Sequence, residues 1–172
     1  PVFNMTKNSC IIRLHEKKIF KADFSVTQHA CNGGKFCGDS CRCFEDGEGN
    51  FNAILSDGMG TGSSAAVEGS IVAELAKQFL KFGIGLNCAL KLINSVMRFN
   101  TKSETLTTLD ALSVNLFTGE VKLIKAGSPA TFVIHEGEIR KINFSSLPVG
   151  ILNDVSASGE VFKLMPQDTV IM

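Results

Sequence analysis

A strand, a glycine-rich turn and a long helix follow one another directly within residues 51–82. The strand is predicted over residues 51–56, and the turn is Asp57-Gly58-Met59-Gly60-Thr61-Gly62. The helix is predicted over residues 63–82, where Val67, Ile71, Leu75 and Phe79 recur every four positions. An amphipathic helix of this kind buries its apolar stripe against another layer. The segment therefore indicates a helix that packs on a sheet and begins beside the glycine-rich turn.

Further strands are expected on both sides of this unit. The strand predicted over residues 40–44 pairs with that over residues 51–56 through a turn rich in Asp, Gly and Asn. A second helix is predicted to begin near Asn87. The other predicted strands cover residues 11–14, 19–26, 109–117, 121–126, 131–135, 138–142, 159–165 and 169–172. Strands, two adjacent helices and a strand meander indicate an α+β fold with both helices on one face of an antiparallel sheet.

Composition limits the kinds of protein that this chain can be. Residues 1–172 are expected to form a single domain. The 17 Lys and Arg residues balance 17 Asp and Glu residues, which argues against nucleic acid as the main partner. No run of about 18 apolar residues is present, and residues 1–9 lack the apolar part of a signal peptide. The sequence stops within the apolar stretch 169–172, so we expect a domain that is incomplete at its C-terminus.

Six cysteines occur, and Cys37, Cys41 and Cys43 lie close together. Without a secretory signal, reduced thiols are expected. The C-x3-C-x-C spacing differs from the C-x2-C pairs that are typical of zinc sites. If Cys41 and Cys43 lie on a strand, they point to the same face, which suits packing as well as chelation. Buried thiols are the favoured interpretation, and a zinc module around residues 31–43 is the alternative.

Asp39 and Asp57 are the candidate site residues. Asp57 follows an apolar strand and precedes glycines, which allow backbone carbonyls to approach a ligand closely. Asp39 lies at the start of the strand predicted over residues 40–44. In a hairpin, the start of one strand meets the end of the other, so the two aspartates are expected to lie close together. Two adjacent carboxylates repel each other unless a cation lies between them, so the pair is a candidate Mg²⁺ or Mn²⁺ site.

The same residues also have a purely structural interpretation. Asp-Gly is a common turn dipeptide, and D-G-x-G-x-G is compatible with a glycine-rich turn into a helix. The GxxxxGK[ST] pattern of a phosphate-binding loop is missing. Spacing alone therefore leaves both a metal site and a structural turn open.

Several segments, taken in order, resemble a known family. Cys37-Gly38-Asp39 and the stretch Leu55-Ser56-Asp57-Gly58-Met59-Gly60-Thr61-Gly62 resemble the signature of the phosphatase domain of the stage II sporulation protein E family. This family belongs to the PPM-type metal-dependent serine/threonine phosphatases, and the resemblance covers about residues 24–172. It continues through Glu68, Ser70, Thr107-Thr108-Leu109-Asp110, Thr118-Gly119, Lys125-Ala126-Gly127-Ser128-Pro129 and Ser146-Leu147-Pro148-Val149-Gly150-Ile151.

The resemblance implies a PPM-type α/β sandwich, with antiparallel sheets flanked by helices. It also implies hydrolysis of phosphoserine or phosphothreonine by water at a two-metal Mn²⁺ or Mg²⁺ site. In such phosphatases the SDG aspartate bridges the metals and the next glycine offers its carbonyl, which assigns these roles to Asp57 and Gly58. The upstream aspartate serves the metal site directly or through water, which assigns that role to Asp39. No cysteine nucleophile is required, so Cys37 has no part in this chemistry.

One feature departs from the family pattern. The family supplies further metal-binding aspartates after the last strand, about where this sequence stops. The resemblance therefore implies an incomplete metal site and a fragment of weak or no activity. Asp154 and Asp168 lie in loops and are not identified as substitutes, and Asp110 is interpreted as a structural polar residue. The histidines, none of which lies beside the aspartate motifs, are His15, His29 and His135.

The expected function is a metal-dependent protein phosphatase. By resemblance, its substrate is a phosphorylated anti-anti-sigma factor, whose dephosphorylation activates a sporulation sigma factor. The resemblance also implies membrane spans outside this stretch and a domain on the cytoplasmic side. A homodimer is a further expectation. The alternative is a catalytically incomplete domain that acts as a regulatory phosphoprotein-binding module. The zinc module around the cysteines is the third hypothesis.

Overall fold

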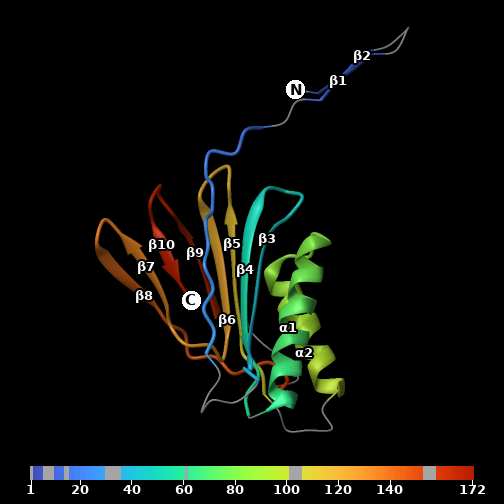
Figure 1. Ribbon diagram of the computed structural model, residues 1–172, viewed down its shortest axis with the longest axis vertical. Helices are drawn as coiled ribbons and strands as arrows, with labels where there is room; N and C mark the ends of the chain where they lie inside the picture. Colours follow the sequence, from blue (N-terminus) through green and yellow to red (C-terminus); the bar gives the residue numbers. More distant parts are fainter. Residues whose placement is uncertain are drawn as a thin grey trace.

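A five-stranded antiparallel sheet forms the centre of the fold (Figure 1). The structure, a computed structural model, describes residues 2–5, 10–13, 16–29, 36–60, 62–100, 106–152 and 158–172. His15, Cys31, Thr61 and Asp154 lie outside these residues. The strands of the sheet, in spatial order, are β3 (Asp39–Glu45), β4 (Asn50–Asp57), β5 (Leu109–Asn115), β6 (Glu120–Ala126) and β9 (Ser158–Lys163).

Two helices, α1 (Ser63–Lys81) and α2 (Leu86–Asn100), cover one face of this sheet (Figure 1). Their apolar residues and those of the sheet form one core cluster, in which Val72 and Ile93 of the helices are fully buried with Ile54 of β4. The burial of these stripes stabilises the layer, because each fully buried aliphatic side chain contributes about 1.5–3 kcal/mol. The packing of both helices on one face agrees with the expectation from sequence.

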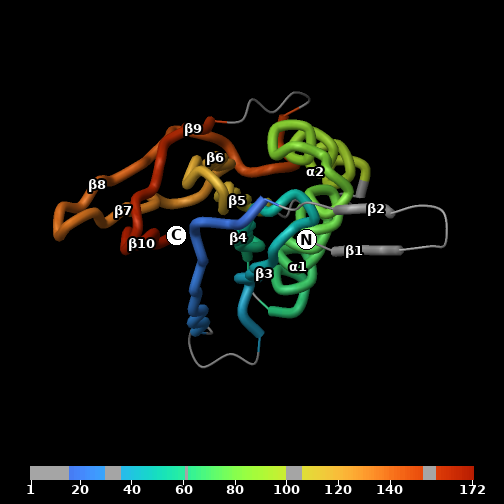
Figure 2. Tube along the Cα trace, turned by 90° about the horizontal axis from the view of Figure 1, so that it is seen from above, coloured from blue at the N-terminus to red at the C-terminus, as the bar shows by residue number. Residues whose placement is uncertain are grey.

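A second, three-stranded sheet lies on the other side of the central sheet, as Figure 2 shows. Its strand order is β10 (Thr169–Ile171), β7 (Thr131–His135) and β8 (Glu138–Ile142). Leu112 and Leu123 of the central sheet pack here with Val133 of β7 in a second apolar cluster. A further antiparallel pair, β1 (Val2–Met5) with β2 (Cys10–Arg13), precedes these elements in the chain.

The alternation of side chains along β5 explains how the sheet serves two cores. Ala111 joins the cluster under the helices, whereas Leu112 and Val114 belong to the cluster between the sheets. Successive residues of a strand point to opposite faces, so a strand with apolar residues at both parities is buried on both sides. The result is an α+β sandwich of antiparallel sheets with helices on one flank, and this confirms the predicted fold class.

The strand predicted over residues 19–26 is wrong. Residues 16–29 run in an irregular path beside the central sheet, and the backbone N–H groups of Ile19 and Phe20 both donate to the carbonyl of Leu116. Phe20 packs against the cluster between the sheets, and the ring of Phe24 lies 5.7 Å from that of Phe51. Phe20 and Ala22 thus cover part of a sheet face, whereas Ile19, Phe24 and Val26 are exposed. The apolar composition of the segment resembles that of a strand, but no strand ladder is formed.

The described helices contain no segment that is both long and apolar enough to cross a membrane.

Candidate metal site

The β3–β4 hairpin brings the two candidate aspartates together. Asp39 and Asp57 are cross-strand partners at the end of the ladder opposite the turn. Paired residues of an antiparallel ladder point to the same face of the sheet, with side chains in contact distance. The predicted juxtaposition of Asp39 and Asp57 is therefore confirmed, whereas their role as metal ligands stays a prediction.

The turn of the hairpin fixes this register. Asp46 accepts hydrogen bonds from the backbone N–H groups of Glu48 and Asn50, each at 2.9 Å. Its second carboxylate oxygen accepts from the side-chain amides of Asn50 and Asn52. These hydrogen bonds, with burial opposing them, hold the pKa of Asp46 below its usual value. These hydrogen bonds form in one register of the β3–β4 ladder. That register also places Asp39 opposite Asp57.

Three glycines allow the chain to close tightly around this pair. The N–H of Gly58 donates to the carbonyl of Gly38 at 3.1 Å. A Cβ atom at Gly38 would lie 2.7 Å from the carbonyl oxygen of Gly58 and 3.0 Å from Oδ1 of Asp57. A Cβ atom at Gly69 of α1 would lie 2.3 Å from the carbonyl oxygen of Gly38. Residues with side chains would push α1 and the two strand ends apart.

The backbone of Asp57 is held from the side of residues 106–108. The N–H of Asp57 donates to the hydroxyl of Thr108 at 2.9 Å, and its carbonyl accepts from the N–H of Thr108 at 2.9 Å. Ser56 donates to the carbonyl of Thr108 at 2.8 Å, and Met59 N–H donates to the carbonyl of Leu106 at 2.7 Å. These hydrogen bonds leave the carboxylate of Asp57 as the group of this residue that is available to a ligand.

The electrostatics of the pair favour a cation. Partial burial, then the negative charge of Asp39 and a hydrogen bond with its carboxyl group, raise the pKa of Asp57. A raised pKa means that the ionised form is disfavoured in the folded chain as it stands. The close approach at Gly38 places Oδ1 of Asp57 and the Gly58 carbonyl oxygen around one small space. Carboxylate and carbonyl oxygens are the ligands that Mg²⁺ and Mn²⁺ prefer, so the donor set fits such an ion.

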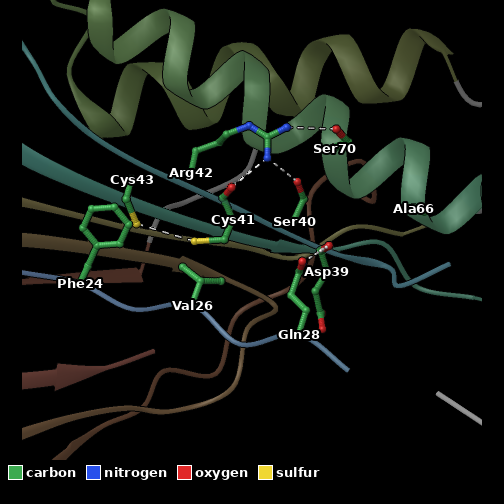
Figure 3. Close-up of a pocket in the computed structure, with 10 residues that line it drawn as sticks. All are labelled: Phe24, Val26, Gln28, Asp39, Ser40, Cys41, Arg42, Cys43, Ala66 and Ser70. Atoms are coloured by element: carbon green, nitrogen blue, oxygen red, sulfur yellow. Dashed lines mark hydrogen bonds between the residues drawn. The ribbon is translucent and has the colours of Figure 1, made fainter. Parts of the chain in front are cut away.

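Arg42 links β3 to α1 beside the site (Figure 3). Its guanidinium donates to the carboxylate of Glu74 at 3.0 Å, to the hydroxyl of Ser70 at 3.2 Å and to that of Ser40 at 2.9 Å. The hydrogen bond from Gln78, then that from Arg42, and to a lesser extent that from Lys77, hold the pKa of Glu74 down at about 2. The charge-assisted hydrogen bonds fix the position of β3 relative to the helix.

A cavity of about 430 Å³ opens next to Asp39 (Figure 3). Phe24, Val26 and Gln28 form one side of it, and the amide of Gln28 donates to the backbone carbonyl of Asp39 at 2.8 Å. The thiol of Cys37 donates to Oδ2 of Asp39 at 3.4 Å. The cavity thus reaches the candidate metal site along β3.

The other acidic candidates lie elsewhere in the fold. Asp110 is 1% exposed and pairs with Lys125 in the interior, in agreement with a structural role. Asp168 accepts hydrogen bonds from the backbone N–H of Met165 and from His135, near β10. Within the described residues no group of three or more His, Cys, Asp or Glu side chains is placed to hold a metal ion. The zinc module predicted around residues 31–43 includes Cys31, which lies outside the described residues, so it stays a prediction. The metal candidate within the described residues consists of two carboxylates and a backbone carbonyl.

Gly69 and Arg42 help to build the site, and neither was identified as a site residue from the sequence. Gly69 lies in the interior of α1, and glycine within a helix costs about 1 kcal/mol relative to alanine, so its position was a signal of close packing. Arg42 carried no comparable signal, because its partners on α1 are distant in the sequence.

Solved structures share this arrangement of sheets and helices. The PP2C phosphatase domain of SpoIIE from Bacillus subtilis matches with a TM-score of 0.74 and 32% sequence identity, over 83% of this chain and 42% of that chain. The structure of RsbX in complex with magnesium has the same fold, with a TM-score of 0.70 at 16% identity, over 84% of this chain and 69% of that one. The fold, with 32% identity to the solved SpoIIE domain, defines a domain of the PP2C phosphatase type, also called the PPM type.

Sequence comparison identifies the family. The profile described as Stage II sporulation protein E (SpoIIE) matches residues 47–172, and the chain belongs to this family. Stage II sporulation protein E of Priestia megaterium is 32% identical over 163 residues, which are 95% of this chain and 28% of that protein. The Bacillus subtilis (strain 168) protein is 32% identical over 155 residues, 90% of this chain and 19% of that protein. The chain therefore spans less than a third of the length of either relative.

Proposed function

We propose that this domain hydrolyses phosphoserine or phosphothreonine in a protein substrate, with Mn²⁺ or Mg²⁺ bound by Asp39, Asp57 and the carbonyl of Gly58. The observation that carries the proposal is the cross-strand pairing of Asp39 with Asp57, next to the Gly58 carbonyl. Membership of the SpoIIE family and the PP2C-type fold support the same reaction class.

The residues of this chain have separate tasks in that reaction. Asp39 and Asp57 hold the cation by their carboxylates, and Thr108 keeps Asp57 in place through its backbone. Gly38 and Gly69 let α1 approach the strand ends, so that the Gly58 carbonyl stays near Asp57. When bound, the divalent cation neutralises phosphate oxygens and lowers the pKa of water.

The substrate and its setting follow from family membership and are proposals as well. We propose a phosphorylated anti-anti-sigma factor as substrate and the activation of a sporulation sigma factor as the result. We also propose that the whole protein is anchored in the membrane by segments outside this chain, with the phosphatase domain on the cytoplasmic side, and that the domain forms homodimers. The support is the family match over residues 47–172.

Phosphate release from a phosphoserine protein tests the reaction. The assay compares Mn²⁺ with EDTA, for this chain and its Asp57→Asn form. We expect release that requires Mn²⁺ and that Asp57→Asn reduces by at least about 10²-fold, because the variant removes a charge of the cation site. Release that continues in EDTA, or that is equal in Asp57→Asn, would contradict the proposal.

A phosphoprotein-binding module without turnover is the second candidate. It is favoured by one observation, that the described residues supply only two carboxylates to the cation site. The same assay on a chain extended at its C-terminus separates the two. Turnover in the extended chain supports the phosphatase, whereas binding of phosphoprotein without turnover in both chains supports the binding module.

A further inference from the structure

Cys41 and Cys43 place two thiols side by side next to the candidate metal site. They are two residues apart on β3, so both side chains leave the strand on the same face. Their Sγ atoms lie 3.8 Å apart, and Figure 3 shows the two sulfurs facing each other. Arg42, between them, points to the other face and contacts α1.

The pair is accessible to a small molecule. Cys41 and Cys43 both line the cavity of about 430 Å³ that extends to Asp39, and neither residue is fully buried. Cys37 and Cys88 have different surroundings. The thiol of Cys37 contacts the oxygens of His29 and Asp39, and Cys88 is exposed on α2.

We propose that Cys41 and Cys43 form an oxidant-modification site, at which hydrogen peroxide converts the two thiols into a disulfide within β3. In the first step one sulfur attacks the peroxide, the O–O bond breaks, and a sulfenic acid and water are formed. In the second step the neighbouring sulfur displaces the hydroxyl group, which leaves as water while the S–S bond forms. Two thiols lose two electrons and two protons, the peroxide accepts them, and a dithiol reductant reverses the reaction.

The geometry of β3 makes this disulfide labile. Residues two positions apart in an extended strand have Cα atoms about 6.6–6.8 Å apart. This separation is at the upper limit for disulfides, most of which have Cα atoms about 5.5–6 Å apart, so a relaxed bond requires β3 to shorten or bend locally. A disulfide that distorts the backbone is more easily reduced than a relaxed one, as a reversible modification requires.

The distortion acts directly on the candidate metal site. Arg42 lies within the ring that the disulfide closes, and its guanidinium joins β3 to Ser70 and Glu74 of α1. Asp39 is two residues from Cys41 on the same strand and pairs with Asp57. Bending β3 therefore changes the separation of the two carboxylates. This coupling to the cation rests on the proposed function, whereas the modification itself does not.

Peptide mapping by mass spectrometry tests the modification. The reduced chain is treated with hydrogen peroxide, free thiols are alkylated, and all six cysteines are followed. We expect a Cys41–Cys43 disulfide as the main product, formed equally in the matched controls Cys37→Ser and Cys88→Ser and reversed by dithiothreitol. Cys41→Ser and Cys43→Ser are expected to yield a trapped sulfenic acid instead. A main product that links either thiol to Cys31 or Cys37, or oxidation confined to Cys88, would overturn the assignment.

Two measurements test the coupling. The oxidised chain is expected to bind Mn²⁺ about tenfold more weakly than the reduced chain, because metal affinity falls when the groups that orient a ligand are displaced. In Cys43→Ser, peroxide is expected to leave the Mn²⁺ affinity unchanged. Hydrogen exchange of the β3 amides is expected to be faster after oxidation, whether or not a metal binds. Unchanged exchange overturns the coupling. A reduced chain that binds no Mn²⁺ refutes the proposed cation site and leaves the disulfide result standing.

Discussion

Lys125 and Asp110 form an ion pair in the interior between the two sheets. They are cross-strand partners on β6 and β5, and both are almost fully buried. The ammonium also donates to Thr131 at 2.7 Å, whereas Oδ1 of Asp110 has no hydrogen-bond partner within the described structure. Burial raises the pKa of Asp110, and the charge of Lys125 acts in the opposite direction. The pair therefore depends on both partners being present.

Lys125→Met is expected to destabilise the fold by about 3–5 kcal/mol near neutral pH, because it leaves a buried carboxylate without its cation. When folding raises the pKa of an acid, the ionised acid destabilises the folded state at pH values above its unfolded pKa, which is about 3.9 for aspartate. The loss is therefore expected to shrink as the pH falls toward about 4.5, which denaturant unfolding at both pH values measures.

Asp110→Asn combined with Lys125→Met is expected to recover most of that loss, since no uncompensated charge remains. Lys122→Met is the matched control, because its ion pair with Glu120 is 3.9 Å long and exposed, and a change within about 0.5 kcal/mol is expected. A double variant as unstable as Lys125→Met would contradict this account.

The pairing of Asp39 with Asp57 could be predicted from sequence patterns because the residues that determine it are close together in the chain. Asp46 and the asparagines that it binds are within a few residues, and they determine the register that brings Asp39 to Asp57. Arg42 could not be predicted in the same way, because its partner Glu74 is 32 positions away. Contacts of that kind depend on how elements pack, which no short pattern encodes.

At the level of elements, the approach of α1 to the ends of β3 and β4 is the feature on which the site depends. Gly69 is buried in α1 against the carbonyl of Gly38, and a Cβ atom at Gly58 would lie 2.0 Å from the carbonyl of Ala65. The helix thus contacts both backbone segments that flank the aspartates. A change in that contact moves the Gly58 carbonyl relative to Asp57.

Gly69→Ala is expected to destabilise the fold by about 1–3 kcal/mol, because the added methyl group would lie 2.3 Å from a backbone oxygen. The displaced helix is also expected to weaken Mn²⁺ binding, measured by calorimetric titration of the chain. Gly47→Ala is the matched control, since a Cβ atom there has no atom within 4 Å and both quantities should stay near the wild-type values. Equal Mn²⁺ affinity in both variants would argue against a role of this contact in the site.

The ion pair between His135 and Asp168 joins β7 to the turn before β10. The imidazole Nδ1 lies 2.6 Å from the carboxylate, whose hydrogen bond and charge raise the pKa of His135. When folding raises the pKa of a base, the protonated base stabilises the folded state. This stabilisation is fully present below the unfolded pKa, about 6.5 for histidine, and is lost as the pH rises through the folded pKa. His135→Ala is therefore expected to lower the melting temperature at about pH 5.5 more than at about pH 9. An effect that does not vary with pH would mean that packing, and not the pair, is responsible.

On the scale of the whole molecule, the sequence predicted the layers better than the connections between strands. Most strands and both helices lie within two residues of their predicted positions, because apolar periodicity reflects burial directly. The assignment of strands to sheets was beyond such patterns. β9 returns to the central sheet beside β6, whereas β10 pairs with β7 in the second sheet. These pairings join residues far apart in the chain, and a similar apolar pattern fits either sheet.

The site and the stability of the whole domain are linked through the charge of Asp57. Like charges directly opposite each other in a ladder destabilise it by roughly 0.2–1 kcal/mol, a small amount because Asp57 is exposed to solvent. Asp57→Asn is therefore expected to raise the melting temperature of the metal-free domain by about 1–4 °C.

Mn²⁺ should stabilise the wild-type chain and leave the stability of Asp57→Asn nearly unchanged. At a hundredfold excess over its dissociation constant, the ion is expected to stabilise the wild-type chain by about 2.7 kcal/mol, because it binds the folded state alone. Asp57→Asn should lose that gain, while the control Asp23→Asn, which removes an exposed partner of Lys21, should keep it. Calorimetric melts of the three chains with and without Mn²⁺ measure this. If Asp57→Asn is less stable than the wild-type chain without metal and is still stabilised by Mn²⁺, then Asp57 serves the fold and not a cation. If Asp57→Asn is more stable without metal and is not stabilised by Mn²⁺, then Asp57 is retained for cation binding although it lowers the stability of the metal-free domain.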